Sequence, residues 1–217
     1  HEFDIAGIPA FAADTLTERE RRSDANWHEA AMIGAAQMQA IQRWLARHPR
    51  QPKLLCCGSV LGLPALRTLE EPSLCRNADD WSGYPAAWTQ LCEFIARQGI
   101  EGLVVLAGDY HLSAVAELEI RAAGAAAPAR VVSVVASGWN ASLPFANFRR
   151  SEHPWEQTVR LPGGCPTVDV WSTPQLLSDA QRQFTKLTFD LDGAQPVLEV
   201  ASFEESGAQT RAVRLRL

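Results

Sequence analysis

Three runs of hydrophobic residues constrain the fold of this chain more than any other feature of its sequence. Residues 53–57, 103–107 and 131–136 are almost continuously apolar. Such runs are typical of β-strands that are covered on both faces, as in the sheet of an α/β fold. They predict a layered domain in which helices pack against a sheet.

Each apolar run ends in glycine and polar residues. The strand ends read Gly58-Ser59, Gly108-Asp109-Tyr110-His111 and Ser137-Gly138-Trp139-Asn140. In layered α/β folds, ligands gather at one end of the sheet, because the loops there carry chemistry while packing fixes the strands. We therefore expect a functional site at these strand ends.

Two segments have the residue spacing of amphipathic helices. We expect Asp24 or Asn26 to cap the first helix, and His48-Pro49 to end it. Its apolar positions are Ile33, Ile41, Trp44 and Leu45. Pro85 fits the first turn of the second helix, which Gly99 ends.

Further strands are expected near both ends of the chain. Residues 2–5 and 10–13 indicate a hairpin with Gly7 and Pro9 in its turn, and residues 114–120 indicate a strand. An antiparallel meander is expected over residues 184–189, 197–203 and 211–217. Together these elements predict an α/β (α+β) fold with a mixed sheet and additional C-terminal antiparallel strands.

Composition favours a small-molecule partner. The chain has 217 residues, 47% of them hydrophobic, so it can bury a sizeable core. A net charge of -5 argues against binding nucleic acid or an anionic membrane surface. No apolar run approaches the roughly 20 residues that a transmembrane helix needs, so we expect a soluble protein.

The cysteines and the first residue bear on the cellular setting. Five cysteines, including the adjacent pair Cys56-Cys57 in an apolar run, predict small core residues in a reducing compartment rather than a disulfide framework. This usage leans towards the cytoplasm. The chain opens with His1 rather than Met, so we expect a longer polypeptide, and the localisation stays open.

Asp109 and His111 form the most specific candidate site. A buried strand ends in a carboxylate and an imidazole two residues apart, and both could face one site if the backbone turns at Gly108. Oxygen and nitrogen ligands of this kind suit hard or borderline metal ions. The alternative is that Asp109 caps the following segment while His111 makes an ordinary hydrogen bond.

Four segments bear on these alternatives: Asp80-Trp81-Ser82-Gly83-Tyr84-Pro85, Gly108-Asp109-Tyr110-His111, the strand end from Phe11 to Arg19, and the helix from Gly34 to Leu45. In order and spacing they resemble the PhoD-like alkaline phosphatase family, which is similar to the calcineurin-like metallophosphoesterases. The resemblance covers most of residues 3–140 and corresponds to the C-terminal half of the family's core. It fades after residue 140.

The resemblance implies a domain division and a function. Residues 1–150 would form half of a metallophosphoesterase-type α/β sandwich, and residues 151–217 would be a strand-rich extension packed on it. Asp109 and His111 would be metal ligands, with Fe, Ca, Mn or Zn as candidate ions. The implied activity is metal-dependent hydrolysis of a small phosphoester, in which metal-activated water attacks phosphorus. The N-terminal half of the same polypeptide would supply the other ligands.

Two departures from the family pattern leave a second function open. Leu16 and Trp88 stand where the family usually has arginine, and neither replaces a planar, charged guanidinium. The alternative function is therefore a catalytically inactive phosphoesterase-like domain that binds a ligand or partner.

Asp80, Trp81 and Tyr84 are candidates for the substrate cleft. Trp81 would offer a flat apolar wall and Tyr84 a hydroxyl group. The alternative is that both aromatic residues pack the loop onto the sheet, while Asp80 acts near the helix N-terminus.

Overall fold

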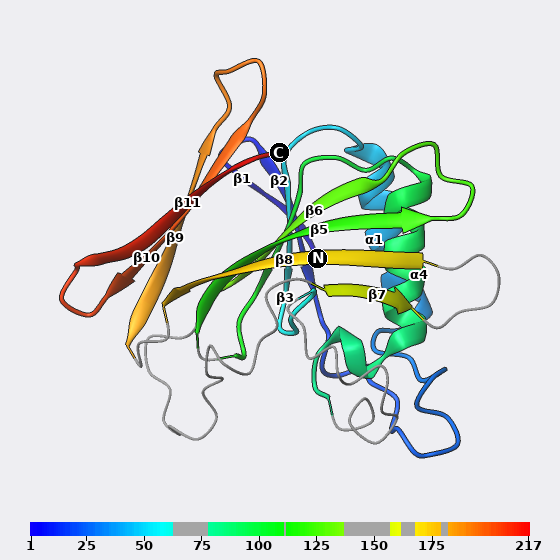
Figure 1. Cartoon of the computed structure of the whole chain (residues 1–217). Helices are drawn as coiled ribbons and strands as arrows, with labels where there is room; N and C mark the ends of the chain where they lie inside the picture. Colours follow the sequence, from blue (N-terminus) through cyan, green and yellow to red (C-terminus); the bar gives the residue numbers. More distant parts are fainter. Residues whose placement is uncertain (63–77, 111, 137–156, 162–167, 179–181) are drawn as a thin grey trace.

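The computed structural model describes residues 1–62, 78–110, 112–136, 157–161, 168–178 and 182–217. Its described strands form an eight-stranded mixed sheet in the order β1-β2-β3-β4-β6-β5-β8-β7 and a three-stranded antiparallel sheet in the order β11-β10-β9. Two helices of the described residues cover one face of the larger sheet and the smaller sheet lies against the other (Figure 1). This confirms the predicted mixed α/β fold with C-terminal antiparallel strands.

Four parallel strands form one half of the larger sheet. They are β2 (Ile8–Ala13), β3 (Lys53–Cys57), β4 (Leu103–Ala107) and β6 (Ala129–Val135). The last three coincide with the three apolar runs of the sequence. Because the strands are parallel, their carboxyl ends meet at one edge of the sheet, as expected for the functional site.

Antiparallel strands flank the parallel group. β1 (Glu2–Ile5) joins β2 through Ala6 and Gly7, whose φ values of 51° and 87° suit a tight two-residue hairpin. Pro9, expected in the turn, lies within β2. The other edge of the sheet is built from β5 (Ser113–Ala122), β8 (Val168–Ser178) and β7 (Gln157–Leu161).

The division between the two sheets lies later in the chain than residue 150. β7 and β8 belong to the expected extension of residues 151–217, yet both pair into the larger sheet. Among the described strands, β9 (Gln183–Asp190), β10 (Val197–Glu204) and β11 (Gln209–Arg216) form the separate meander. The sheets therefore separate between Ser178 and Gln183.

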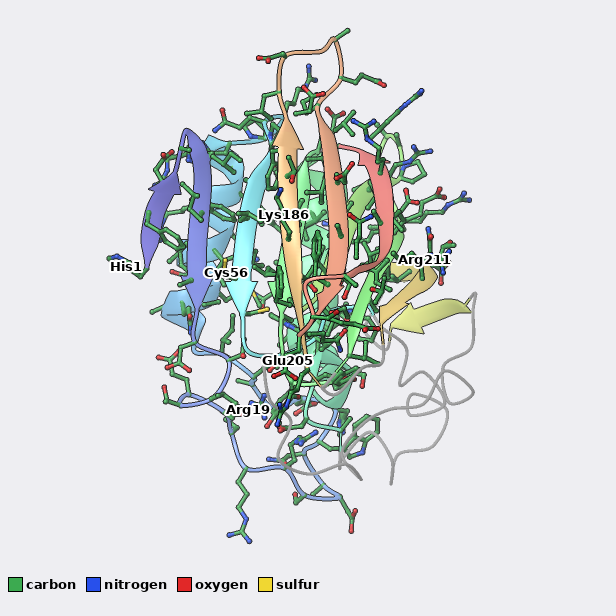
Figure 2. The ribbon with its side chains drawn as sticks, turned by 90° about the vertical axis from the view of Figure 1, so that its left-hand side faces the viewer. His1, Arg19, Cys56, Lys186, Glu205 and Arg211 are labelled. Atoms are coloured by element: carbon green, nitrogen blue, oxygen red, sulfur yellow. The ribbon has the colours of Figure 1, made fainter. Side chains whose placement is uncertain are left out.

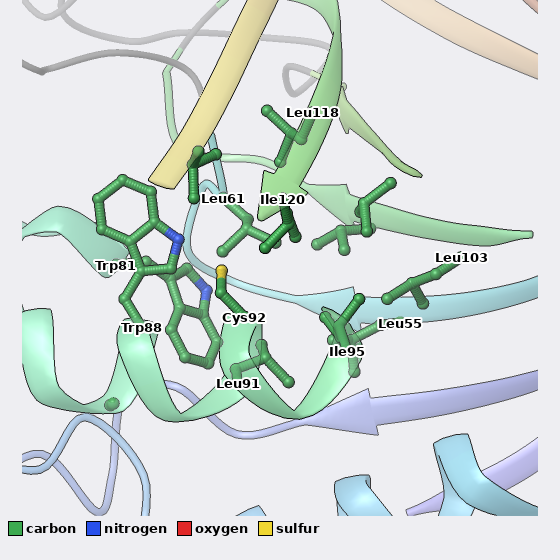
Figure 3. Packing of buried hydrophobic residues seen from close by; sticks show 14 of the residues in the cluster. Leu55, Leu61, Trp81, Trp88, Leu91, Cys92, Ile95, Leu103, Leu118 and Ile120 are labelled. Atoms are coloured by element: carbon green, nitrogen blue, oxygen red, sulfur yellow. The ribbon is translucent and has the colours of Figure 1, made fainter. Parts of the chain in front are cut away.

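Helices α1 (Ala35–Arg47) and α4 (Pro85–Arg97) pack on one face of the larger sheet. Pro85 occupies the first turn of α4, as predicted. Figure 3 shows side chains of α4 meeting strand residues; those labelled include Trp88, Leu91, Cys92, Ile95, Leu55, Leu103 and Ile120. The expected N-cap of α1 was wrong, because the helix begins after Gly34 rather than near Asp24 or Asn26.

The three-stranded sheet covers the opposite face. Its Leu198, Val200 and Leu215 join Val104 and Val132 of the larger sheet in a second hydrophobic cluster. Figure 2 looks onto this smaller sheet, with Lys186 and Arg211 labelled on it and Arg19 beyond the end of β3. The parallel strands are thus held from both sides, while their carboxyl ends stay accessible to loops.

In the described part of the chain, neither helix has the length and apolar character needed to cross a membrane. Cys56, Cys57 and Cys92 are free thiols, and burial raises the pKa of Cys57 to about 12. A thiol with so high a pKa stays protonated and is a poor nucleophile at neutral pH.

Candidate active site

A depression of about 410 Å³ lies at the carboxyl edge of the parallel strands. It is lined by Ala13, Cys56, Cys57, Gly58, Leu106, Ala107, Gly108 and Ala136. These residues end β2, β3, β4 and β6 or directly follow them. The lining carries no formal charge, so charged groups that act on a ligand here must come from the surrounding loops.

Asp109 lies next to this depression in an unusual backbone conformation. Its φ is +76°, and the Tyr110 N–H donates a 3.0 Å hydrogen bond to the Gly108 carbonyl oxygen. These two features define a γ-turn with positive φ at its centre, which is rare and strained in proteins. The turn directs the chain away from β4 and leaves Asp109 exposed at the sheet edge.

The second predicted ligand, His111, lies outside the described residues. The joint orientation of Asp109 and His111 therefore stays a prediction. Within the described ranges, no group of three or more His, Cys, Asp or Glu side chains is arranged to hold a metal ion.

Asp80 is joined to the same turn by a buried hydrogen bond. The Tyr110 hydroxyl donates to Asp80 Oδ2, and the Ser82 N–H donates to Asp80 Oδ1 over 2.8 Å. Burial raises the pKa of Asp80, while the donors from Ser82 and Tyr110 oppose that rise. The pKa of Tyr110 is raised well above its usual value by burial and by the neighbouring Asp80 carboxyl group.

All three cleft candidates are buried. Asp80, Trp81 and Tyr84 are 3%, 1% and 3% exposed. Asp80 caps the short 3-10 helix η1 (Trp81–Gly83) by accepting from Ser82, and Trp81 packs in the core beside Trp88 (Figure 3). This arrangement is what the packing alternative predicts, whereas contact with a substrate stays a prediction.

Arg19 connects three loops at the sheet edge. It donates to the Thr15 carbonyl after β2, to Ser59 Oγ after β3 over 2.7 Å, and to Asp79 before η1. The Thr15 and Ser59 hydroxyl oxygens are 2.9 Å apart. The Arg19 guanidinium also lies over the Tyr84 ring, 5.6 Å from its centroid. Arg19 therefore braces the loops around the site rather than presenting a free cation to it.

Asp14 orders the loop that follows β2. Its Oδ1 accepts from the backbone N–H groups of Leu16 and Thr17, each over 2.9 Å. Hydrogen bonds from the Thr17 hydroxyl and from these backbone groups lower the pKa of Asp14 to about 2. The side chain of Gln37 in α1 makes two hydrogen bonds to the main chain of Asp14. Gln37 Oε1 accepts from the Asp14 N–H, and Gln37 Nε2 donates to the Asp14 carbonyl oxygen. The loop is thus tied to α1.

These linked loops lie within the part of the chain that matches a known family. A family model described as PhoD-like phosphatase matches residues 10–159. The match covers well over half of the chain. This chain belongs to the PhoD-like phosphatase family. The predicted family resemblance is therefore confirmed.

One solved structure, titled "Structure of PhoD", is similar to this PhoD-like chain. The similarity has 12% sequence identity and a TM-score of 0.49, and it covers 99% of this chain and 43% of that one. The chain thus spans less than half the length of the PhoD chain that it matches. The comparison with curated proteins found no match.

In this PhoD-like chain, Leu16 and Trp88, the two positions predicted to depart from the family pattern, have different settings. Leu16 is 61% exposed in the loop after β2 and lies close to Gly58. Trp88 is only 2% exposed and belongs to the main core. Only the Leu16 departure can change the charge at the edge where the depression lies.

Sequence reasoning did not identify Arg19, Ser59 and Tyr110 as interacting residues. Arg19 and Tyr110 lie within segments that carried the family resemblance. Nothing local in the sequence indicates which residues they contact. Ser59 directly follows Gly58 at the end of an apolar run. That position was the only local signal, because the partners of the Ser59 hydroxyl group, Arg19 and Thr15, lie 40 and 44 residues away in the chain.

Proposed function

We propose that this chain is part of a metal-dependent phosphoric ester hydrolase of the PhoD-like type, acting on a small phosphoester. The observation that carries the proposal is the exposed Asp109, presented by a γ-turn at the edge where four parallel strands end. Family membership supports phosphoester hydrolysis as the general chemistry.

The donor chemistry at this edge fits part of a metal site. Asp109 offers an exposed carboxylate, and His111 follows two residues later in the sequence. A carboxylate and an imidazole suit Fe, Ca, Mn or Zn ions to differing degrees, so the identity of the metal stays open. We further propose that the N-terminal half of the polypeptide supplies the remaining ligands. When bound, such ions lower the pKa of water and neutralise phosphate charge.

The residues of this chain would bind and orient the ester rather than balance its charge. The eight residues that line the depression are uncharged, so they can contact the alcohol part of an ester without favouring an anion. Arg19, a cation bound to the surrounding loops, is engaged by Asp79, Thr15 and Ser59. This supports a mechanism in which bound ions, and not these side chains, neutralise the phosphate.

A second candidate function is a ligand- or partner-binding domain without catalysis. The exposed Leu16 supports it, because an apolar residue occupies the rim where the family usually places arginine. Metal content separates the two functions. Near-stoichiometric metal in the purified full-length protein is expected for the enzyme, and metal-free protein that binds one specific partner is expected for the binding domain.

The direct test is turnover of a chromogenic phosphoester by the full-length protein with Fe, Ca, Mn or Zn ions. We expect metal-stimulated hydrolysis that Asp109→Asn and His111→Ala each reduce by at least about 100-fold, because second-sphere changes alone already cost 10- to 100-fold. Asp192→Asn, in the exposed turn after β9, is the matched control for a lost carboxylate. Unchanged turnover in the Asp109 and His111 variants would reject the proposal.

A further inference from the structure

The turn at Asp109 requires an explanation, because its conformation is unfavourable for a residue with a side chain. Its φ of +76° lies in the region that L-amino acids rarely adopt. A strained backbone of this kind persists only where the surrounding structure holds it, and such residues concentrate at functional sites. The structure should therefore contain an element that holds the turn.

Tyr110 is the residue that can do so. It directly follows Asp109, its own N–H closes the γ-turn, and its side chain is only 6% exposed. The Tyr110 hydroxyl donates to Asp80 Oδ2, thirty residues earlier in the chain. The main chain of Tyr110 thus belongs to the strained turn, while its hydroxyl group is bound in the protein interior.

Asp80 is itself held from the opposite side. Its Oδ1 accepts from both the N–H and the hydroxyl of Ser82, and the residue is 3% exposed. The carboxylate cannot turn away from Tyr110 without losing these hydrogen bonds inside the protein, where they are costly to leave unmade. The loop before α4 therefore acts as a fixed point for the end of β4.

We infer that Asp80 and Tyr110 are positioning residues that hold the strained turn and thereby orient Asp109 towards a metal ion. This inference rests on the proposed function, since it takes Asp109 as a metal ligand. Both side chains are buried, so the role assigned to them is indirect. Their role is to keep the carboxylate of Asp109 at the sheet edge in one conformation, which lowers the cost of ordering it when an ion binds.

The test compares two variants that each remove one hydroxyl donor from the same carboxylate. Tyr110→Phe releases the turn, whereas Ser82→Ala removes one of the two donors to Asp80 Oδ1 and leaves the Ser82 N–H to hold the carboxylate. Binding of Mn²⁺ to the full-length protein is followed by electron paramagnetic resonance of the free ion. We expect Tyr110→Phe to weaken Mn²⁺ binding about tenfold, as is usual when a residue that orients a ligand is changed, and Ser82→Ala to change it less than about twofold.

The outcomes separate this inference from the proposed function. Equal Mn²⁺ affinities in the two variants would overturn the positioning role and leave the metal site standing. Absence of Mn²⁺ binding by the unaltered protein would reject the metal site, and the inference with it.

A second measurement needs no metal. Asp109→Gly relieves the strain, so in metal-free full-length protein it should raise Tm by about 3 °C. In the Tyr110→Phe background the turn is already free to relax, and the same substitution should then change Tm by less than about 1 °C. An equal rise in both backgrounds would show that Tyr110 does not hold the turn.

Discussion

Arg19 and Asp79, sixty residues apart in the sequence, are joined at two points: the guanidinium donates to the carboxylate of Asp79 and, over 2.8 Å, to its main-chain carbonyl oxygen. The side chain of Arg19 is 14% exposed and that of Asp79 is 67% exposed. The same guanidinium reaches Thr15 and Ser59. One side chain thus connects the loops that follow β2 and β3 to the loop that precedes α4.

Replacing Arg19 with lysine should therefore destabilise the protein although the charge is kept. A single ammonium group cannot reproduce a planar fork that reaches Thr15, Ser59 and Asp79 together. We expect the free energy of unfolding of the full-length protein, from urea denaturation, to fall by about 1–2 kcal/mol. Arg21→Lys, at a neighbouring exposed position, should change it by less than about 0.5 kcal/mol. Equal effects of the two substitutions would contradict the bracing role.

Lys53 should make stability depend on pH in the alkaline range. It is 0% exposed, and burial lowers its pKa from 10.5 to about 8, with Glu101 opposing the change. Its ammonium group donates to the main-chain carbonyls of Gln51 and Glu101. Between pH 8 and 10.5 the unfolded chain holds more protons on Lys53 than the folded chain, so this residue makes unfolding less favourable as pH rises. Between the two ends of this pH range, the contribution of Lys53 to the free energy of unfolding changes by about 3 kcal/mol.

Buried thiols have the opposite effect in the alkaline range: they lower the free energy of unfolding as pH rises. The raised pKa of Cys57, to about 12, means that unfolding releases its proton more readily as pH rises. The contribution of Lys53 is therefore read from the difference between the unaltered protein and Lys53→Met, measured by urea unfolding at pH 7.5 and pH 10. We expect unfolding free energy to rise more with pH in the unaltered protein than in the variant. Parallel pH profiles would show that Lys53 does not titrate in this range.

Asp14 should contribute stability that disappears in acid. Its folded pKa of about 2 lies below the ordinary value of 3.8, chiefly because of the hydrogen bond from the Thr17 hydroxyl. The contribution is complete above pH 3.8 and declines as pH falls towards 2, since the unfolded chain then binds the proton first. Asp14→Asn should lower the urea midpoint at pH 5 more than at pH 3. Asp192→Asn is the control, and a pH-independent effect of Asp14→Asn would contradict the assignment.

Leu16 and Trp88 should respond differently to arginine. Trp88 is 2% exposed in the main core, so Trp88→Arg removes packing and buries a charge, and we expect a loss of at least about 3 kcal/mol or failure to fold. Leu16 is 61% exposed, so Leu16→Arg should change the free energy of unfolding by less than about 0.5 kcal/mol. Thermal unfolding of both variants tests this, and a large loss in Leu16→Arg would show that another part of the protein covers Leu16.

The strands of the parallel group could be predicted because their signal is local. The apolar runs at 53–57, 103–107 and 131–136 correspond to β3, β4 and β6 within about two residues at each end. β7 and β8 were not predicted, since the sequence after residue 140 shows little periodicity. β8 pairs with β5, about fifty residues earlier in the chain.

The start of α1 shows how tertiary contacts override a local cap signal. Asp24 and Asn26 are favourable capping residues, but the helix begins after Gly34. The Gly34 N–H donates to the Glu18 carboxylate over 2.9 Å, and Gln37 bonds the loop after β2. These partners come from a different part of the chain, so no local pattern could indicate them.

For this protein, the order of residues alone determined the family, the core strands and the strand end that carries Asp109, because hydrophobic periodicity and short motifs are local properties. Only the tertiary structure decided that Tyr110 meets Asp80 and that Arg19 meets Asp79. Those contacts depend on which strands lie side by side and where their loops converge. The order of the strands in the sheet is set by packing of the whole chain, so it cannot be read from any single segment.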